Sequence, residues 1–285
     1  MILPTVKLVD WLLSKVKAIL SDAVIRKLDA VLLLVGGFGA YVLIALAAVT
    51  TLVIGIRMGS ATLIIGAIVA VPVGLVLQYL STKMLGSVDR LLNSTRTEMT
   101  SAGFLEVVAV VLIVLAIVAP ILGVVDAIEN TSLIPLATGA AVAVLALYGA
   151  AVALNPVLVN VHISGAATIG LEAVGIVTFL LKTFYRFTPV AFGVFVVYIS
   201  ILLLELLIIS FGSGFAGAGL VLTGVLWNAA LALLWPFVAY IVFVCVYLAV
   251  DLVRSIVLVG RVADQYRRPE DAKAIPPETS ADIKG

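Results

Sequence analysis

Long apolar stretches separated by short polar ones dominate the hydrophobic pattern of this chain. A helix needs about 20 apolar residues to cross a bilayer. Stretches of that kind lie at 30–56, 61–80, 104–125, 135–154 and 189–212, and a longer block follows at 216–258. The pattern therefore predicts an all-α polytopic membrane protein with about six transmembrane helices.

The last apolar block is too long for one simple crossing. As a continuous helix it would extend about 64 Å, twice the thickness of a hydrocarbon core of about 30 Å. Two crossings would need a turn at 233–237 (Leu-Leu-Trp-Pro-Phe), where nothing polar marks one. We therefore expect a half-membrane segment at 216–230, entered through the glycine-rich stretch 211–219, and then one crossing at 231–253. Pro236 would begin or kink that crossing.

The N-terminal segment has the period of an amphipathic helix. Val9, Leu13 and Val16 fall on its apolar side, and Lys7 and Ser14 fall on its polar side. We interpret 1–28 as a helix lying in the membrane interface, although a helix packed on a cytoplasmic partner would show the same period. The remainder divides into one transmembrane helical domain, 29–258, and a polar tail, 259–285, which we expect to be disordered after Val262.

A patterned connection at 155–188 joins the fourth and fifth crossings. The alternation of Val159, Val161 and Ile163 with polar residues predicts a short strand, and 171–187 predicts an interfacial helix. A free strand edge could pair with a second copy of the chain or with another subunit. The candidates for docking such a partner are the polar residues Asn160, His162, Lys182 and Arg186. The alternative is a loop that only tethers two helices.

Composition and charge support the membrane class and suggest an orientation. The chain is 64% hydrophobic and 12% charged, whereas a soluble domain is about half apolar and a quarter charged. The net charge of +1 provides no field that would attract nucleic acid. With six crossings and the N-terminus inside, every Lys and Arg except Arg57 falls on the inner side. We therefore expect a multi-pass protein of the cell membrane with both termini cytoplasmic.

Residues that could support metal or catalytic chemistry are scarce. Cys245 and His162 are the single cysteine and the single histidine, so the sequence offers neither an intrachain disulfide nor a pair of histidine ligands. It also lacks the motifs of metalloproteases, serine hydrolases and phosphate-binding loops. We expect no metal, no cofactor and no enzymatic activity.

Glu205 stands out because it lies within the apolar stretch 200–210. It follows Pro189 by about 24 Å of helix, in the outer half of the bilayer. Residues seven apart share a helix face, so Ala191, Tyr198, Glu205 and Gly212 form one stripe. We expect this stripe to face protein, because an unpaired carboxylate in hydrocarbon is costly. The expected partner of Glu205 is Arg57, followed by Asn228 and Thr223.

Two functions remain open at this stage. In the first, the chain is an oligomeric channel or transport subunit whose pathway includes Glu205, Tyr198, Arg57 and Asn228. In the second, it is a non-catalytic membrane scaffold or the anchoring subunit of a larger complex. Small residues at 36–40 and 139–141 would allow helices to approach closely. We therefore expect a homo-oligomer or an association with other membrane subunits.

Overall fold

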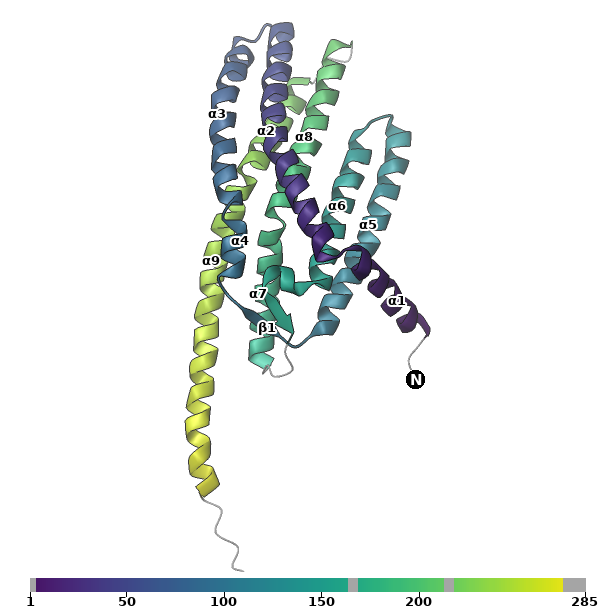
Figure 1. The fold of residues 1–285 in the computed structure, drawn as a ribbon. Helices are drawn as coiled ribbons and strands as arrows, with labels where there is room; N and C mark the ends of the chain where they lie inside the picture. Colours follow the sequence, from purple (N-terminus) through teal and green to yellow (C-terminus); the bar gives the residue numbers. More distant parts are fainter. Residues whose placement is uncertain (1–3, 164–168, 213–217, 274–285) are drawn as a thin grey trace, which may run out of the picture.

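The computed structural model describes residues 4–163, 169–212 and 218–273. Within these ranges, six helices are long and apolar enough to cross a membrane, which confirms the predicted all-α polytopic class. They are α2 (Asp22–Met58), α3 (Ala61–Leu85), α5 (Ala102–Asn130), α6 (Ile134–Leu154), α8 (Thr188–Phe211) and α9 (Ala218–Lys273) (Figure 1).

Helices α2, α3, α8 and α9 pack together around an apolar core that includes Leu43, Leu203 and Leu233. The backbones of α2 and α8 approach closely at glycine. A Cβ atom on Gly193 would lie 2.6 Å from the carbonyl oxygen of Leu32. Larger residues would therefore separate these two helices, and the glycine makes α2 and α8 a tightly packed pair.

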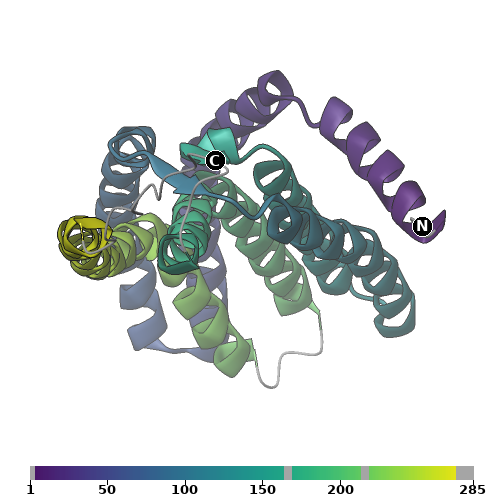
Figure 2. The ribbon, with the colours of Figure 1, turned by 90° about the horizontal axis from the view of Figure 1, so that it is seen from below.

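Helices α5 and α6 form a hairpin in which the two helices pack as closely as α2 and α8 do. A Cβ atom on Gly123 would lie 2.6 Å from the carbonyl oxygen of Pro135, and one on Gly139 would lie 2.6 Å from that of Ala119. Thr131 adopts a left-handed conformation where α5 ends. The main contact of this hairpin with the other membrane helices is that of α6 with α8. Seen from below, α8 lies between the hairpin and α9 (Figure 2).

One end of the molecule carries the short elements, and we name it the basic end after its lysines and arginines. These elements are α1 (Pro4–Ile19), α4 (Val88–Asn93), β1 (Thr97–Met99), the 3₁₀ helix η1 (Pro156–Val159), β2 (Val161–Ile163) and α7 (Ile169–Arg186). The helix predicted at 171–187 is confirmed as α7, and the predicted strand is present but shorter, because Val159 belongs to η1. Strand β2 pairs in parallel with β1, so one of its edges is occupied within the chain.

The N-terminal helix is present but ends earlier than predicted. Helix α1 ends at Ile19 and α2 begins at Asp22, so the predicted boundary at residue 28 falls inside α2. Leu13 is buried in the same core as Leu105 and Val152. This side of α1 therefore packs against the body of the protein, while Trp11 and Lys17 are exposed.

The predicted half-membrane segment at 216–230 is wrong. Helix α9 is continuous from Ala218 through Pro236 to Lys273, and its apolar part runs from Gly219 to Val257. Proline disturbs the backbone hydrogen bonds of the preceding helical turn. Here Ser81 of α3 donates a hydrogen bond to the carbonyl oxygen of Leu233, in that turn. Hydroxyl groups of neighbouring helices allow proline within membrane helices in this way.

Two further expectations differ from the structure. The residues after Val262 continue α9 to Lys273, where the sequence predicted disorder. The rest of the predicted tail, and residues 213–217 of the predicted entry to the half-membrane segment, lie outside the described residues. Some of the small residues expected to support self-association pack within the chain, since Gly36 faces Phe192 and Gly139 faces Pro120. Gly37 has nothing within 4 Å of a built Cβ atom and Ala140 is exposed, so the oligomer stays a prediction.

Candidate functional site

Glu205 lies at the end of the molecule opposite the basic end, between α8 and the α5–α6 hairpin. Ser132, in the connection between α5 and α6, donates a hydrogen bond of 2.9 Å to Oε1 of Glu205. The other carboxylate oxygen, Oε2, is buried and has no hydrogen-bond partner among the described residues. Within the described residues, only one of the two carboxylate oxygens of Glu205 therefore has a hydrogen-bond partner.

The stripe of α8 that contains Glu205 faces protein, as the sequence predicted. The hydroxyl group of Thr138 on α6 donates a hydrogen bond of 3.3 Å to the hydroxyl oxygen of Tyr198. Ala191 is only 4% exposed, whereas Gly212 is exposed. Tyr198 also lines a cavity of about 210 Å³ together with Asn228. Two of the predicted pathway residues are therefore close together.

The predicted partner of Glu205 is wrong. Arg57 is exposed in the last turn of α2, and the hydrogen bond of Glu205 is with Ser132. Asn228 and Thr223 instead donate to backbone oxygens of their own helix, those of Gly224 and Gly219. Side chains that bond within their own turn are less available to a carboxylate on another helix.

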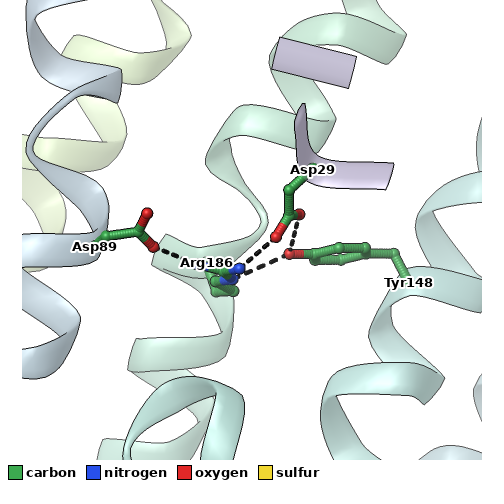
Figure 3. A network of polar contacts seen from close by, with 4 residues as sticks. All are labelled: Asp29, Asp89, Tyr148 and Arg186. Atoms are coloured by element: carbon green, nitrogen blue, oxygen red, sulfur yellow. Dashed lines mark hydrogen bonds and ion pairs between the residues drawn. The ribbon is translucent and has the colours of Figure 1, made fainter. Parts of the chain in front are cut away.

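Arg186 forms a second polar centre, at the basic end (Figure 3). Its guanidinium group forms ion pairs with Asp29 of α2 and Asp89 of α4. Its Nε donates to the hydroxyl oxygen of Tyr148 on α6, at 3.2 Å. Tyr148 in turn donates to Asp29, at 2.7 Å. We name these four residues the Arg186 network, and they connect four helices.

The charge on Arg186 is well supported by its neighbours. Burial opposes the charged form, but Tyr148, Asp29 and Asp89 outweigh this effect and raise the pKa of the guanidinium group above its ordinary value. The side chain of Arg186 is 11% exposed and that of Asp89 is 79% exposed. The network therefore joins a buried cation to a carboxylate at the surface.

A cavity of about 630 Å³ adjoins the Arg186 network. Its walls contain Arg186, Asp29 and Asp89 together with Arg26 and apolar residues of α2, α3 and α4, and it reaches Pro189 at the start of α8. The cavity thus has polar groups on one part of its wall and apolar groups on another. Three of the four residues of the Arg186 network line it, and the fourth, Tyr148 of α6, contacts Arg186.

Three polar contacts follow α6 from the end of α7 at one end to the α5–α6 connection at the other, along the side of α6 that meets α8. We name this line the α6–α8 seam. Tyr148 contacts Arg186 at the basic end, Thr138 contacts Tyr198, and Ser132 contacts Glu205 at the opposite end. Pro189 and Glu205 are separated by about 24 Å of helix. The seam therefore carries polar groups over most of the thickness of a hydrocarbon core, about 30 Å.

The predicted docking residues are used mainly inside the chain. The ammonium group of Lys182 donates to the carbonyl oxygens of Thr95, at 2.5 Å, and Asn160, at 3.4 Å, and its residue is 0% exposed. Asn160 donates to Thr95 through its amide, and Arg186 belongs to the network. His162 lies in β2 beside Glu98 of β1 and is partly exposed. Of the four, His162 is the one whose side chain forms no hydrogen bond or ion pair within the described residues.

Burial and a neighbouring charge affect Lys182. Burial, and then the positive charge of Arg254, lower its pKa to about 8. Tyr247 of α9 donates to the hydroxyl oxygen of Thr95, at 2.6 Å. These contacts tie α7 and α9 to the segment between α4 and β1. They indicate a structural part for Lys182.

Glu172 of α7 caps the start of α5. Its carboxylate accepts hydrogen bonds from the backbone amides of Thr100 and Ser101, the latter at 2.8 Å. Burial raises the pKa of Glu172, but hydrogen bonds from the side chains of Ser101 and Thr100, and then from these two backbone amides, outweigh burial and lower the pKa to about 2. A carboxylate is favourable at a helix start because the first amides lack partners there.

Sequence reasoning missed four residues of the two polar centres: Asp29, Asp89, Tyr148 and Ser132. Asp29 and Asp89 each lie close to basic residues in the sequence, so they resemble ordinary interfacial charges. Ser132 lies in a connection whose conformation no periodicity predicts. A weak signal existed for Tyr148, since a tyrosine hydroxyl within an apolar helix requires a partner.

The fold and the seam define a polytopic integral membrane protein with polar groups between its helices. Comparisons with known protein families, with curated proteins and with solved structures give no match. Within the described residues, no group of three or more His, Cys, Asp and Glu side chains could hold a metal ion. The polar side chains of the two centres carry carboxylate, hydroxyl and guanidinium groups.

Proposed function

We propose that this chain is a transport subunit that moves a small cation, most simply a proton, along the α6–α8 seam. Glu205 is the group that binds the cation. The observation that carries the proposal is its half-satisfied carboxylate, in which Oε1 accepts from Ser132 and Oε2 is buried without a partner in the described chain. A carboxylate oxygen in that position favours the binding of a cation, because burying an unpaired charge is costly.

The packing supports a seam that can open. Within the hairpin and within the α2–α8 pair, glycine brings backbones together, as at Gly139 and Gly193. Between the described residues of the hairpin and of the α2–α3–α8–α9 group, Thr138 with Tyr198 is an isolated hydrogen bond. In the described chain, polar contacts gather only at Tyr148, which donates to Asp29 of α2 and accepts from Arg186 of α7. Transporters commonly work by rocking one rigid bundle against another around a central site. The hairpin and the α2–α3–α8–α9 group are suited to that motion.

The test is ion flux through the purified protein in liposomes. Vesicles with the parent protein should carry protons down a gradient faster than protein-free vesicles, and Glu205→Gln should lower that rate by about tenfold or more. The matched control is Glu129→Gln, an exposed carboxylate near the end of α5, which should conduct like the parent. Parent vesicles no leakier than protein-free ones, for protons and for monovalent cations, would contradict the proposal.

A second candidate is an anchoring subunit without transport, and one observation favours it. Helix α9 extends beyond the other elements at the basic end (Figure 1). In the C-terminal half of α9, Leu252, Ile256 and Val259 are each more than half exposed, at 66%, 64% and 69%. Residues at this spacing share one helix face. Replacing all three with Ser should leave flux intact under the transport proposal, and should release a bound subunit under this one.

A further inference from the structure

The Arg186 network lies where the cavity at the basic end meets the α6–α8 seam. On one side, Asp29, Asp89 and Arg186 line the cavity, which reaches Pro189. On the other side, α8 continues to Tyr198 and Glu205. We propose that the Arg186 network is the gate of the transport path at this end, an inference that rests on the proposed function of Glu205.

The contacts around Tyr148 close the seam at the gate. The rings of Tyr148 and Phe187 pack edge to face with their centroids 5.3 Å apart. A Cβ atom on Gly149 would lie 2.7 Å from the ring of Phe187, so α6 and the start of α8 are in close contact here. The hydroxyl group of Tyr148 is held by both Arg186 and Asp29. Ala191, about one helical turn further along α8, is 4% exposed.

The charge of Arg186 is suited to a gate for cations. A fixed guanidinium group in a narrow path repels cations and protons. Asp29 and Asp89 balance this charge, but Asp29 belongs to α2 and is 19% exposed, whereas Asp89 belongs to α4 and is 79% exposed. The closed state therefore pairs Arg186 with an inner and an outer carboxylate at once.

The outer carboxylate gives the gate a low-cost open state. If Arg186 releases Asp29 and Tyr148 but keeps Asp89, the guanidinium group moves toward the cavity and retains one ion pair. The carboxylate of Asp29 is then exposed to the path, where it attracts a cation rather than repelling it. In this open state the ion pair with Asp89 of the short helix α4 holds Arg186 in place.

Access to the seam can be measured without measuring transport. In a Cys245→Ser background, which removes the single cysteine, Ala191→Cys places a thiol on the stripe beyond the gate. A charged, membrane-impermeant thiol reagent is added to vesicles whose basic end faces outward. The matched control is Leu33→Cys, since Leu33 lines the cavity on the near side of the network.

Tyr148→Phe opens the gate with little change in packing, because it removes only the hydroxyl group. We expect the labelling rate of Ala191→Cys to rise by about tenfold in Tyr148→Phe and in Asp29→Asn, while that of Leu33→Cys stays unchanged. Asp89→Asn should not raise it, because the inner contacts remain. Thermal unfolding of each variant shows whether it is folded.

The outcomes separate the gate from the transport function. Faster labelling at Ala191→Cys in folded variants supports the gate even if Glu205→Gln leaves flux unchanged, in which case the cation-binding proposal alone fails. Labelling that stays at the parent rate in folded Tyr148→Phe and Asp29→Asn overturns the gate, whatever the flux. A folded variant that is less stable than the parent but is not labelled faster also overturns the gate. The network would then serve only to hold the helices together.

Discussion

Lys182 shows how a single buried cation can link stability to pH. Its ammonium group donates to the carbonyl oxygens of Thr95 and Asn160, and burial lowers its pKa from 10.5 to about 8. The unfolded chain therefore binds more protons than the folded protein between these two values. Stability should consequently rise with pH from about 8 toward 10.5, and the contribution should be absent where both states are protonated, below about 8.

The variant Lys182→Met tests this pH dependence. It should unfold at a lower temperature than the parent, because two carbonyl oxygens lose a donor. The difference should widen between pH 8 and pH 10, since the parent gains stability there and the variant lacks the titrating group. Thermal unfolding in mild detergent at several pH values measures both effects. Lys83→Met, at an exposed position on α3, serves as the control, and parallel pH curves for the parent and Lys182→Met would refute the assignment.

The sequence predicted residue faces better than residue partners. Helical periodicity was sufficient to place Tyr198 and Glu205 on a face that meets protein. It could not supply Ser132, because the conformation of a short connection depends on how two helices end. It also did not show that Arg186 pairs with Asp29, since a basic residue near the membrane interface has the same sequence signal whether it faces a partner or a buried aspartate.

At the scale of elements, the continuity of α9 depends on a contact between helices. Ser81→Ala removes the hydrogen bond to the carbonyl oxygen of Leu233 and should lower the free energy of unfolding by about 1 kcal/mol. In a Pro236→Ala background the same change should cost less, because without the proline ring the amide of Phe237 can donate fully to the carbonyl oxygen of Leu233 within the helix. A double-mutant cycle measured by unfolding gives this coupling. Ser210→Ala, in which the lost bond is to the same helix, is the control, and additive effects of Ser81→Ala and Pro236→Ala would contradict the explanation.

The α5–α6 hairpin gives a second prediction at this scale. Gly139→Ala brings a methyl group against the carbonyl oxygen of Ala119, 2.6 Å away, and backbone atoms cannot move aside cheaply. We expect it to destabilise the protein by roughly 1–3 kcal/mol. Gly66→Ala, a helical position with nothing within 4 Å, should be neutral or slightly stabilising. Thermal unfolding compares the two, and equal effects would show that the hairpin can separate freely.

Spans were predictable from the sequence because bilayer thickness fixes their length, and five of the six crossings follow the predicted ranges closely. The sixth was predicted as broken because Pro236 and the glycine-rich lead-in are local signals of interruption. The contact that allows proline here comes from Ser81, far away in the sequence. Tertiary contacts of that kind decide whether a helix continues, and the local pattern does not contain them.

At the scale of the whole molecule, the sequence predicts that the basic end is cytoplasmic. The structure brings the start of α2, the segment 88–99, the segment 156–163 and α7 to one end (Figure 1), as alternating crossings require. The direction of that end follows from the distribution of lysine and arginine. A reporter fused after Gly260 should be active only in the cytoplasm, and one inserted after Ser60 only outside. The opposite result for both fusions would invert the topology.

Strands β1 and β2 have a consequence for the biosynthesis of this protein. Parallel strands need a long crossover connection, and here the connection between Thr97–Met99 and Val161–Ile163 contains the whole α5–α6 hairpin. The ribosome completes β1 before this hairpin and β2 after it. The strands can meet only when both helices have entered the membrane or neither has, because a single insertion would leave β2 on the wrong side. The pairing of β1 with β2 is therefore possible only in a nascent chain whose α5 and α6 have been inserted together or not at all.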